Sequence, residues 1–179
     1  MGKEAEVGLG ADIRSMSAGA GRGWVTDERM DRSIRMRIAD VLRNKGRTVV
    51  TVPPTATVGG EVVEVLATRN LGALVVLEDT TPIGIVTERD VVRLIHVHGP
   101  PRILDARVSD VMTTAMYTCL PSDSVDSLAA TMTERRIRHL PVLVDGQLAG
   151  IVSIGDVVKS RIDELQAERD QLESYIDQG

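Results

Sequence analysis

In two places of the 179-residue chain the letters GIV are followed by a hydroxyl side chain and, three residues later, an aspartate. The first pair, Thr87 and Asp90, follows the letters GIV in the stretch "GIVTERDVVR". The second pair, Ser153 and Asp156, follows the same letters in "GIVSIGDVVK". A hydroxyl where a helix begins lies beside backbone N–H groups that favour a phosphate. A carboxylate one turn later can accept hydrogen bonds from both hydroxyls of a ribose. The repeated pair therefore indicates nucleotide binding.

The same spacing also describes a helix-capping box, in which the carboxylate bonds back to the backbone N–H of the capping residue. Both interpretations can hold, since a hydroxyl can cap the helix in the empty protein and face a phosphate in the bound one. Gly84 and Gly150 open the two motifs, and a cap does not require a glycine at that place. A residue without a Cβ lets a ligand or a second backbone approach closely. We therefore count both glycines among the candidate site residues.

The two motifs close two copies of one longer pattern. In each copy a β-rich segment ends at a proline, an amphipathic helix follows, two strands are joined by a turn, and a second helix begins at the motif. A single copy would bury too little surface to be stable alone. The predicted fold is α+β (α/β-like), with two β-α-β-β-α repeats packed as a pseudo-twofold pair. The repeats span residues 36–99 and 100–165, with 38–42, 49–58 and 71–79 matching 108–112, 116–125 and 137–145.

Two further segments flank the repeats. Residues 1–35 are rich in Gly, Ser, Ala, Arg and Met and predict a flexible lead-in. Residues 166–179 extend the last helix, whose apolar residues recur at alternating spacings of four and three, a heptad-like pattern. This stripe packs back onto its own domain or meets a second copy of the chain, and we expect a homodimer with twofold symmetry. Its members are Val158, Ile162, Leu165, Leu172 and Ile176, with Arg169 in the same stripe.

The composition limits the classes of partner. A net charge of −5 without a dense basic run argues against nucleic acid, and no apolar run reaches the ~20 residues of a membrane span. The N-terminus lacks the apolar core of a signal peptide. The single cysteine, Cys119, fits a reducing compartment, and we expect it in the core rather than as a nucleophile. These features predict a cytoplasmic protein.

With Gly-apolar-apolar-[Ser/Thr]-x-x-Asp closing each copy, residues 36–165 resemble a tandem pair of CBS domains, and the chain is similar to the stand-alone bacterial members of that family. The resemblance implies a regulatory or sensor module, whose nucleotide-bound arrangement is read by an unknown downstream protein. It implies an adenine nucleotide in the cleft between the repeats, AMP foremost, with NADH, ADP and ATP as further candidates. S-adenosylmethionine or another adenosine ligand is an open alternative, and so is a structural dimer with vestigial sites.

An enzyme is the weaker hypothesis, because the sequence shows no nucleophile elbow, Walker loop, His-rich metal set or paired-carboxylate cleft. We therefore expect no catalytic residue, no catalytic cofactor and no metal. His96 and His98 form an H-x-H at a helix end. Without a nearby carboxylate or Cys partner, we expect both in solvent.

Arg138 and His139 precede the strand "LPV" of the second copy. In the γ subunit of AMP-activated protein kinase, which the repeats resemble, a His-Arg pair before the same strand holds phosphate across the central cleft. Here the order is inverted, and the first copy carries Gly72 and Ala73 instead. The resemblance thus implies phosphate binding by Arg138 and His139, and the difference between the copies argues against two equal sites.

Four further residues complete the candidate site. Arg89, inside the first motif, and Lys159, after the second, are further candidates for phosphate. Thr51 and Thr118 lie on the expected first strand of each copy, where members of the family often use a polar side chain to read the purine edge. Plain β-propensity explains a threonine there equally well, and both interpretations stay open.

Overall fold

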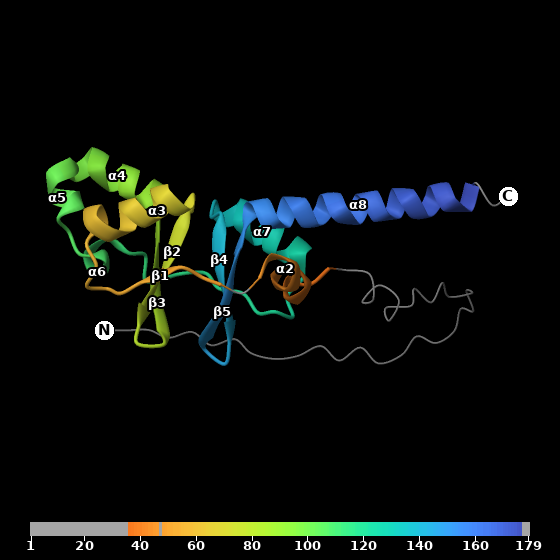
Figure 1. Cartoon of the computed structure of the whole chain (residues 1–179), viewed down its shortest axis with the longest axis horizontal. Helices are drawn as coiled ribbons and strands as arrows, with labels where there is room; N and C mark the ends of the chain where they lie inside the picture. Colours follow the sequence, from red (N-terminus) through yellow and green to blue (C-terminus); the bar gives the residue numbers. More distant parts are fainter. Residues whose placement is uncertain (1–35, 47, 177–179) are drawn as a thin grey trace, which may run out of the picture. The chain divides into compact units, whose positions relative to one another are not determined.

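The computed structural model describes residues 36–46 and 48–176 (Figure 1), so the predicted lead-in 1–35 lies outside the described residues. The first copy follows the predicted order of strand, helix, hairpin and helix. Its elements are β1 (Thr51–Val52), η1 (Val58–Val63) running into α3 (Glu64–Arg69), β2 (Ala73–Glu78), β3 (Thr81–Thr87) and α4 (Glu88–His98). The sheet order is β1-β2-β3, with β1 parallel and β3 antiparallel to β2.

The second copy repeats the helix, the hairpin and the final helix. Its elements are α7 (Val125–Arg135), β4 (His139–Val144), β5 (Gln147–Ser153) and α8 (Ile154–Ile176), and β4 pairs antiparallel with β5. The prediction of a first strand around Thr118 is wrong, because Cys119 forms only an isolated parallel bridge with Val142. The next backbone N–H, that of Leu120, donates to the Asp123 carboxylate at 2.8 Å, so the chain leaves the sheet after one residue pair.

Turn residues fix where these elements end. Asp79 and Asp145 lie between the strands of the two hairpins with φ of 53° and 50°, a left-handed conformation that Asp tolerates better than most residues. α4 ends at Gly99, which has φ of 83° and precedes two prolines. The helix cannot continue through that sequence, and α5 (Pro100–Leu104) begins there. α8 meets no such break and continues to Ile176.

The short helix in front of each copy packs into the core of the other copy. α2 (Ile38–Lys45) brings Ile38, Val41 and Leu42 into the apolar cluster of the second copy, and α6 (Val108–Val111) brings Val108 into that of the first. In Figure 1 the orange α2 lies among the blue and blue-green elements of the second copy, and α2 contacts β5. Each of these two helices therefore lies in the predicted range of one copy (36–99 or 100–165) but contributes to the apolar core of the other copy.

Gly84 and Gly150 leave the space in which the exchanged segments cross the hairpins. A Cβ on Gly150 would lie 2.6 Å from Cδ2 of Leu42 on α2. A Cβ on Gly84 would lie 2.7 Å from Sδ of Met112, just after α6. Of the two uses that the sequence allows for these glycines, a crossing segment of the chain is the one that the structure shows.

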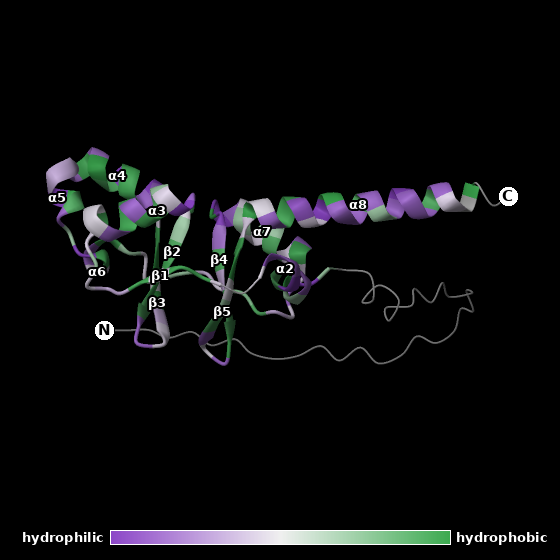
Figure 2. Ribbon diagram, in the orientation of Figure 1, coloured by the Kyte–Doolittle hydropathy of each residue, from purple (hydrophilic) through white to green (hydrophobic). Residues whose placement is uncertain are grey.

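The last helix outgrows the core that it belongs to. Its first part contacts α7 and β5, but from Leu165 onward every side chain that the structure describes is exposed. The apolar residues of the stripe are between 49% (Ile162) and 77% (Ile176) exposed, and Figure 2 shows hydrophobic and hydrophilic residues mixed along α8. The alternative that this stripe packs back onto its own domain is therefore wrong. Among the described residues, no helix combines the length and apolarity that crossing a membrane requires.

Candidate functional site

Thr87 and Asp90 form a capping box where α4 begins. The Thr87 hydroxyl accepts from the Asp90 N–H at 3.2 Å, and Asp90 Oδ2 accepts from the Thr87 N–H at 3.3 Å and from its hydroxyl at 2.7 Å. The second carboxylate oxygen, Oδ1, lies 3.8 Å from the exposed guanidinium of Arg93. The capping interpretation is therefore confirmed, and it uses only one of the two carboxylate oxygens.

A cavity of about 190 Å³ lies against this cap, and both copies build it. Its walls are mainly apolar, with a carboxylate, a hydroxyl, a guanidinium and an imidazole converging on it. Few polar groups in an apolar pocket are typical of small-molecule sites. We call it the first-copy site, and it is lined by Ile85, Thr87, Asp90, Thr113, Ala115, Met116, Tyr117, Ile137, Arg138 and His139.

A smaller cavity shares Thr87, Arg138 and His139 with the first-copy site and is completed by Gly72, Glu88 and Arg89. Gly72 makes room for His139, since a Cβ there would lie 2.7 Å from the imidazole Cε1. The structure thus brings together the start of α4 and three basic side chains that the sequence had placed in different motifs. Helix N-termini and guanidinium groups both favour phosphate.

Arg89 also joins the two copies directly. Its Nη1 donates to the backbone carbonyl of Arg136, at the end of α7, at 2.9 Å. Arg138 is exposed, whereas His139 is half-buried at the start of β4, opposite Ser153. The predicted phosphate residues of the second copy therefore face the hydroxyl and carboxylate of the first.

The imidazole of His139 sits among several charges. Burial lowers its pKa below the usual value, and the positive charges of Lys45 and Arg138 act in the same direction. The carboxylates of Glu88 and Asp156 oppose them without reversing the shift. His139 is therefore more readily neutral than a histidine in water.

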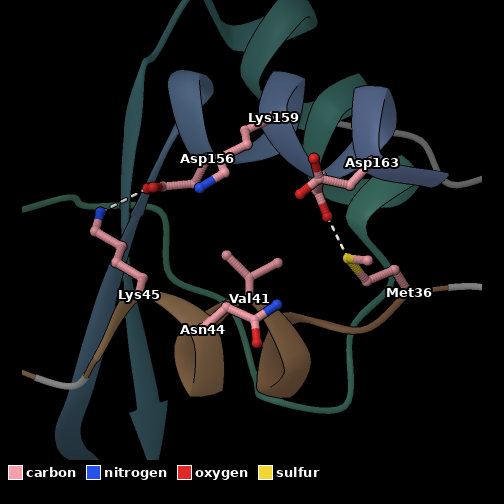
Figure 3. Close-up of a pocket in the computed structure, with 8 residues that line it drawn as sticks. Met36, Val41, Asn44, Lys45, Asp156, Lys159 and Asp163 are labelled. Atoms are coloured by element: carbon pink, nitrogen blue, oxygen red, sulfur yellow. Dashed lines mark hydrogen bonds and ion pairs between the residues drawn. The ribbon is translucent and has the colours of Figure 1, made fainter. Parts of the chain in front are cut away.

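Ser153 and Asp156 form the second cap with the same geometry and one added partner. Asp156 Oδ2 accepts from the Ser153 N–H and hydroxyl, both at 2.7 Å, and also from Lys45 Nζ at 2.6 Å (Figure 3). The ammonium group donates as well to the Ile151 carbonyl at 3.3 Å. Burial alone would raise the pKa of Asp156, but the hydrogen bonds from Lys45 and Ser153 outweigh it and hold the pKa below its usual range.

A cavity of about 300 Å³ borders this ion pair, between α2 and α8 (Figure 3). The predicted phosphate candidate Lys159 is exposed and lines this cavity rather than the first-copy site. Ser160 lies in the same wall, buried, and its hydroxyl contacts Met36 Sδ. The structure therefore separates Lys159 from the basic residues beside Thr87.

The two threonines predicted to read the purine edge lie outside both cavities beside Thr87. Thr51 is half-buried on β1 and pairs with Val75, and Thr118 is exposed in an irregular segment. The neighbours of Thr118 take that place, since Met116 and Tyr117 both line the first-copy site. Thr118 was predicted on the assumption that this segment forms a strand, which it does not.

Met116, Tyr117 and Lys45 are among the residues around the two motifs that the sequence did not predict. Tyr117 is 45% exposed, and the guanidinium of Arg135 lies 5.3 Å from its ring centroid. Its rarity is a usable signal, because the chain has only two Tyr, one Trp and no Phe. Lys45 carries no such signal, since it lies 111 residues from Asp156 in the sequence.

The remaining reactive side chains lie as predicted. Cys119 is buried, and burial, followed by the charge of Asp123, raises the pKa of its thiol to about 12, which fits a core residue. His96 and His98 are exposed at the end of α4. Within residues 36–46 and 48–176, no three His, Cys, Asp or Glu side chains come together as a metal site would require.

The family model described as the CBS domain matches the chain twice, at residues 38–97 and 108–163. Over 153 residues the chain is 37% identical to the CBS domain-containing protein CBSX3, mitochondrial, of Arabidopsis thaliana. That similarity covers 79% of this chain and 72% of the relative.

Solved structures show the same fold. A CBS-domain containing protein from Agrobacterium tumefaciens is 42% identical, with a TM-score of 0.67 over 70% of this chain and 99% of the other. A CBS domain protein from Pyrobaculum aerophilum, complexed with AMP, is 30% identical, with a TM-score of 0.59 over 68% of this chain and 89% of the other.

Proposed function

Since this chain belongs to the CBS-domain family and carries two copies in tandem, we propose that it is a non-catalytic regulatory module that binds an adenine nucleotide at the first-copy site. AMP is the foremost ligand, and ADP, ATP and NADH carry the same adenosine monophosphate unit. The observation that supports this most is the convergence of Asp90, Thr87, Arg138 and His139 on one apolar cavity built by both copies.

Each part of the nucleotide has a matching group. The ribose hydroxyls donate to the Asp90 carboxylate, whose Oδ1 is not used by the cap. The base lies against the apolar walls formed by Ile85, Met116 and Ile137. The phosphate extends toward the start of α4, Arg138 and His139, in the adjoining cavity. The solved relative that is complexed with AMP supports an adenine ligand for this fold.

Binding between the copies gives the module a physical way to signal. A ligand shifts an equilibrium only through its different affinities for the two states. The first-copy site is made from both copies, so a nucleotide there favours the arrangement in which they close on it. A downstream protein that binds this arrangement alone then responds to the nucleotide.

We also propose a homodimer formed through α8. The stripe residues Ile162, Leu165 and Leu172 are 49%, 53% and 64% exposed, and a second copy of the chain would remove them from water. A cytoplasmic location and a protein partner complete the proposal as it follows from the sequence.

Isothermal titration calorimetry with AMP, adenosine, S-adenosylmethionine and GMP tests the ligand. We expect AMP to bind and GMP to bind at least tenfold more weakly, and we expect AMP to be recovered chemically unchanged. Tight binding of S-adenosylmethionine alone would favour the adenosine-ligand alternative. If none of the four compounds binds or raises the melting temperature, the vestigial-site alternative replaces this proposal.

A further inference from the structure

The backbones beside the two motifs are met by different groups. On β3, Ile85 exchanges two backbone hydrogen bonds with Thr113, at 3.0 and 2.9 Å. On β5, the carbonyl of the equivalent residue, Ile151, accepts from the side chain of Lys45 at 3.3 Å. A lysine ammonium thus lies beside the second motif, whereas the equivalent place beside the first motif holds the backbone of Thr113.

The position of Lys45 is fixed by packing. It is the last residue of α2, and Leu42 one turn earlier is buried against Gly150 on β5. From there the ammonium reaches Asp156 at 2.6 Å (Figure 3). The side chains of Lys45 and Asp156 are 38% and 19% exposed, so the ion pair is partly shielded from water and is weakened less by screening than a surface pair.

We infer that Lys45 closes the second motif site by occupying its carboxylate, so that each chain binds one nucleotide, at Asp90. This inference rests on the proposed function. Asp156 Oδ2 already accepts three hydrogen bonds, from the Ser153 N–H, the Ser153 hydroxyl and Lys45. These bonds use Oδ2, as in the first cap, so the difference between the motifs is the ammonium itself: Lys45 neutralises the charge of Asp156 and, bonded also to the Ile151 carbonyl, lies between β5 and the carboxylate where a ribose would have to enter. The first copy also offers Gly72 and Ala73 where the second offers Arg138 and His139, so the second site lacks their phosphate contacts.

The lowered pKa of Asp156 agrees with this geometry, because the carboxylate stays charged and paired under ordinary conditions. Asp90 differs, since the basic group nearest to it is the exposed Arg93 at 3.8 Å. The carboxylate of the second motif is therefore paired with a lysine of the same chain, whereas the carboxylate of the first motif has room for a ligand.

Titration calorimetry with AMP on four proteins tests the inference. The parent should bind one equivalent of AMP. Lys45→Met, which keeps an unbranched apolar stem, should bind two equivalents. Its second equivalent should bind at least tenfold more tightly than any weak second equivalent detected in the parent. Lys45→Met combined with Asp156→Asn should return to one equivalent. Arg43→Met is the matched control, because Arg43 lies on the same helix with a side chain 74% exposed, and it should bind one.

The outcomes separate the inference from the function on which it rests. Two equivalents in the parent, or one in Lys45→Met, would overturn the closure by Lys45 and leave the nucleotide function standing. No binding by any of the proteins would overturn the proposed function and the inference together. Should Lys45→Met fail to fold, Asp156→Asn in the parent decides the matter, because a closed site predicts unchanged stoichiometry and affinity, whereas loss of an equivalent refutes it.

Discussion

The two copies share a backbone frame and differ in the side chains placed on it. The N–H at the start of α4 donates to the Gly72 carbonyl at 3.3 Å, and the N–H at the start of α8 donates to the Arg138 carbonyl at 2.9 Å. Strand register agrees as well, since Ala73 lies opposite Thr87 as His139 lies opposite Ser153. The two copies therefore share these backbone positions, and the differences Gly72/Arg138 and Ala73/His139 place both basic residues in the second copy, beside the first motif.

The largest expected effect concerns the two motif carboxylates. Asp90→Asn should weaken AMP binding on the order of a hundredfold, because two hydrogen bonds to a charged acceptor, each worth about 1.5–3 kcal/mol, lose that charge. Asp156→Asn should change the affinity less than twofold. Isothermal titration calorimetry measures both.

Asn is chosen because its side-chain oxygen can still accept from the N–H of Thr87 or Ser153 and so keeps the capping box. Asp90→Asn should therefore keep close to the parental free energy of unfolding in urea, whereas Asp156→Asn also loses the ion pair with Lys45 and should be less stable. Equal losses of affinity in the two variants would show that the copies are functionally alike. A loss confined to Asp156→Asn would place the nucleotide at the second motif and contradict the proposed site.

The second comparison is between α4, which ends at Gly99, and α8, which continues to Ile176. Leu165→Glu should weaken dimerisation on the order of tenfold or more, since burying a leucine contributes about 1.5–3 kcal/mol and a buried charge adds a penalty. Analytical ultracentrifugation over a concentration series measures the dissociation constant. Gln166→Glu adds the same charge on an exposed neighbour outside the stripe and serves as the control. A monomeric parent, or equal effects of the two changes, would contradict pairing through this stripe.

The third prediction concerns Arg138, which has glycine as its counterpart in the first copy. Arg138→Ala should reduce the ratio of AMP to adenosine affinity about tenfold, because phosphate loses a guanidinium. Arg138→Lys should recover part of that ratio, and Arg102→Ala, an exposed residue of α5, should leave it unchanged. Titration of each protein with both ligands gives the ratio. A ratio within twofold of the parent in Arg138→Ala would leave phosphate binding to the start of α4 alone.

Local sequence signals predicted what local interactions determine. The amphipathic helix expected after the proline of the second copy is α7, and its apolar residues Val125, Leu128 and Met132, at helical spacing, are 4%, 3% and 2% exposed. The capping boxes were readable for the same reason, since Thr87 and Asp90 are three residues apart. The exchange of α2 and α6 was not readable, because Leu42 and Gly150 meet across more than a hundred residues of chain. Lys45 on α2 was unpredictable for the same reason, and so were the segments that cross Gly84 and Gly150, because no local pattern shows which part of the chain lies against them.

The smallest expected effect distinguishes His139 from Ala73, its uncharged counterpart. The folded pKa of His139 is lowered, first by burial and then by Lys45 and Arg138, against Glu88 and Asp156. The unfolded chain therefore binds a proton more readily below about pH 6.5, so this residue's contribution to stability is full above that pH and is lost as the pH falls through the folded pKa.

The free energy of unfolding in urea should fall less between pH 7.5 and 5 in His139→Gln than in the parent. His96→Gln, at an exposed histidine, is the matched control, and His139→Gln should have the shallower slope of the two variants; Asp156, with a lowered pKa, titrates below this window. Equal slopes in the parent and His139→Gln would show that the imidazole is as well solvated as the exposed histidines and that the charges around it do not set its protonation.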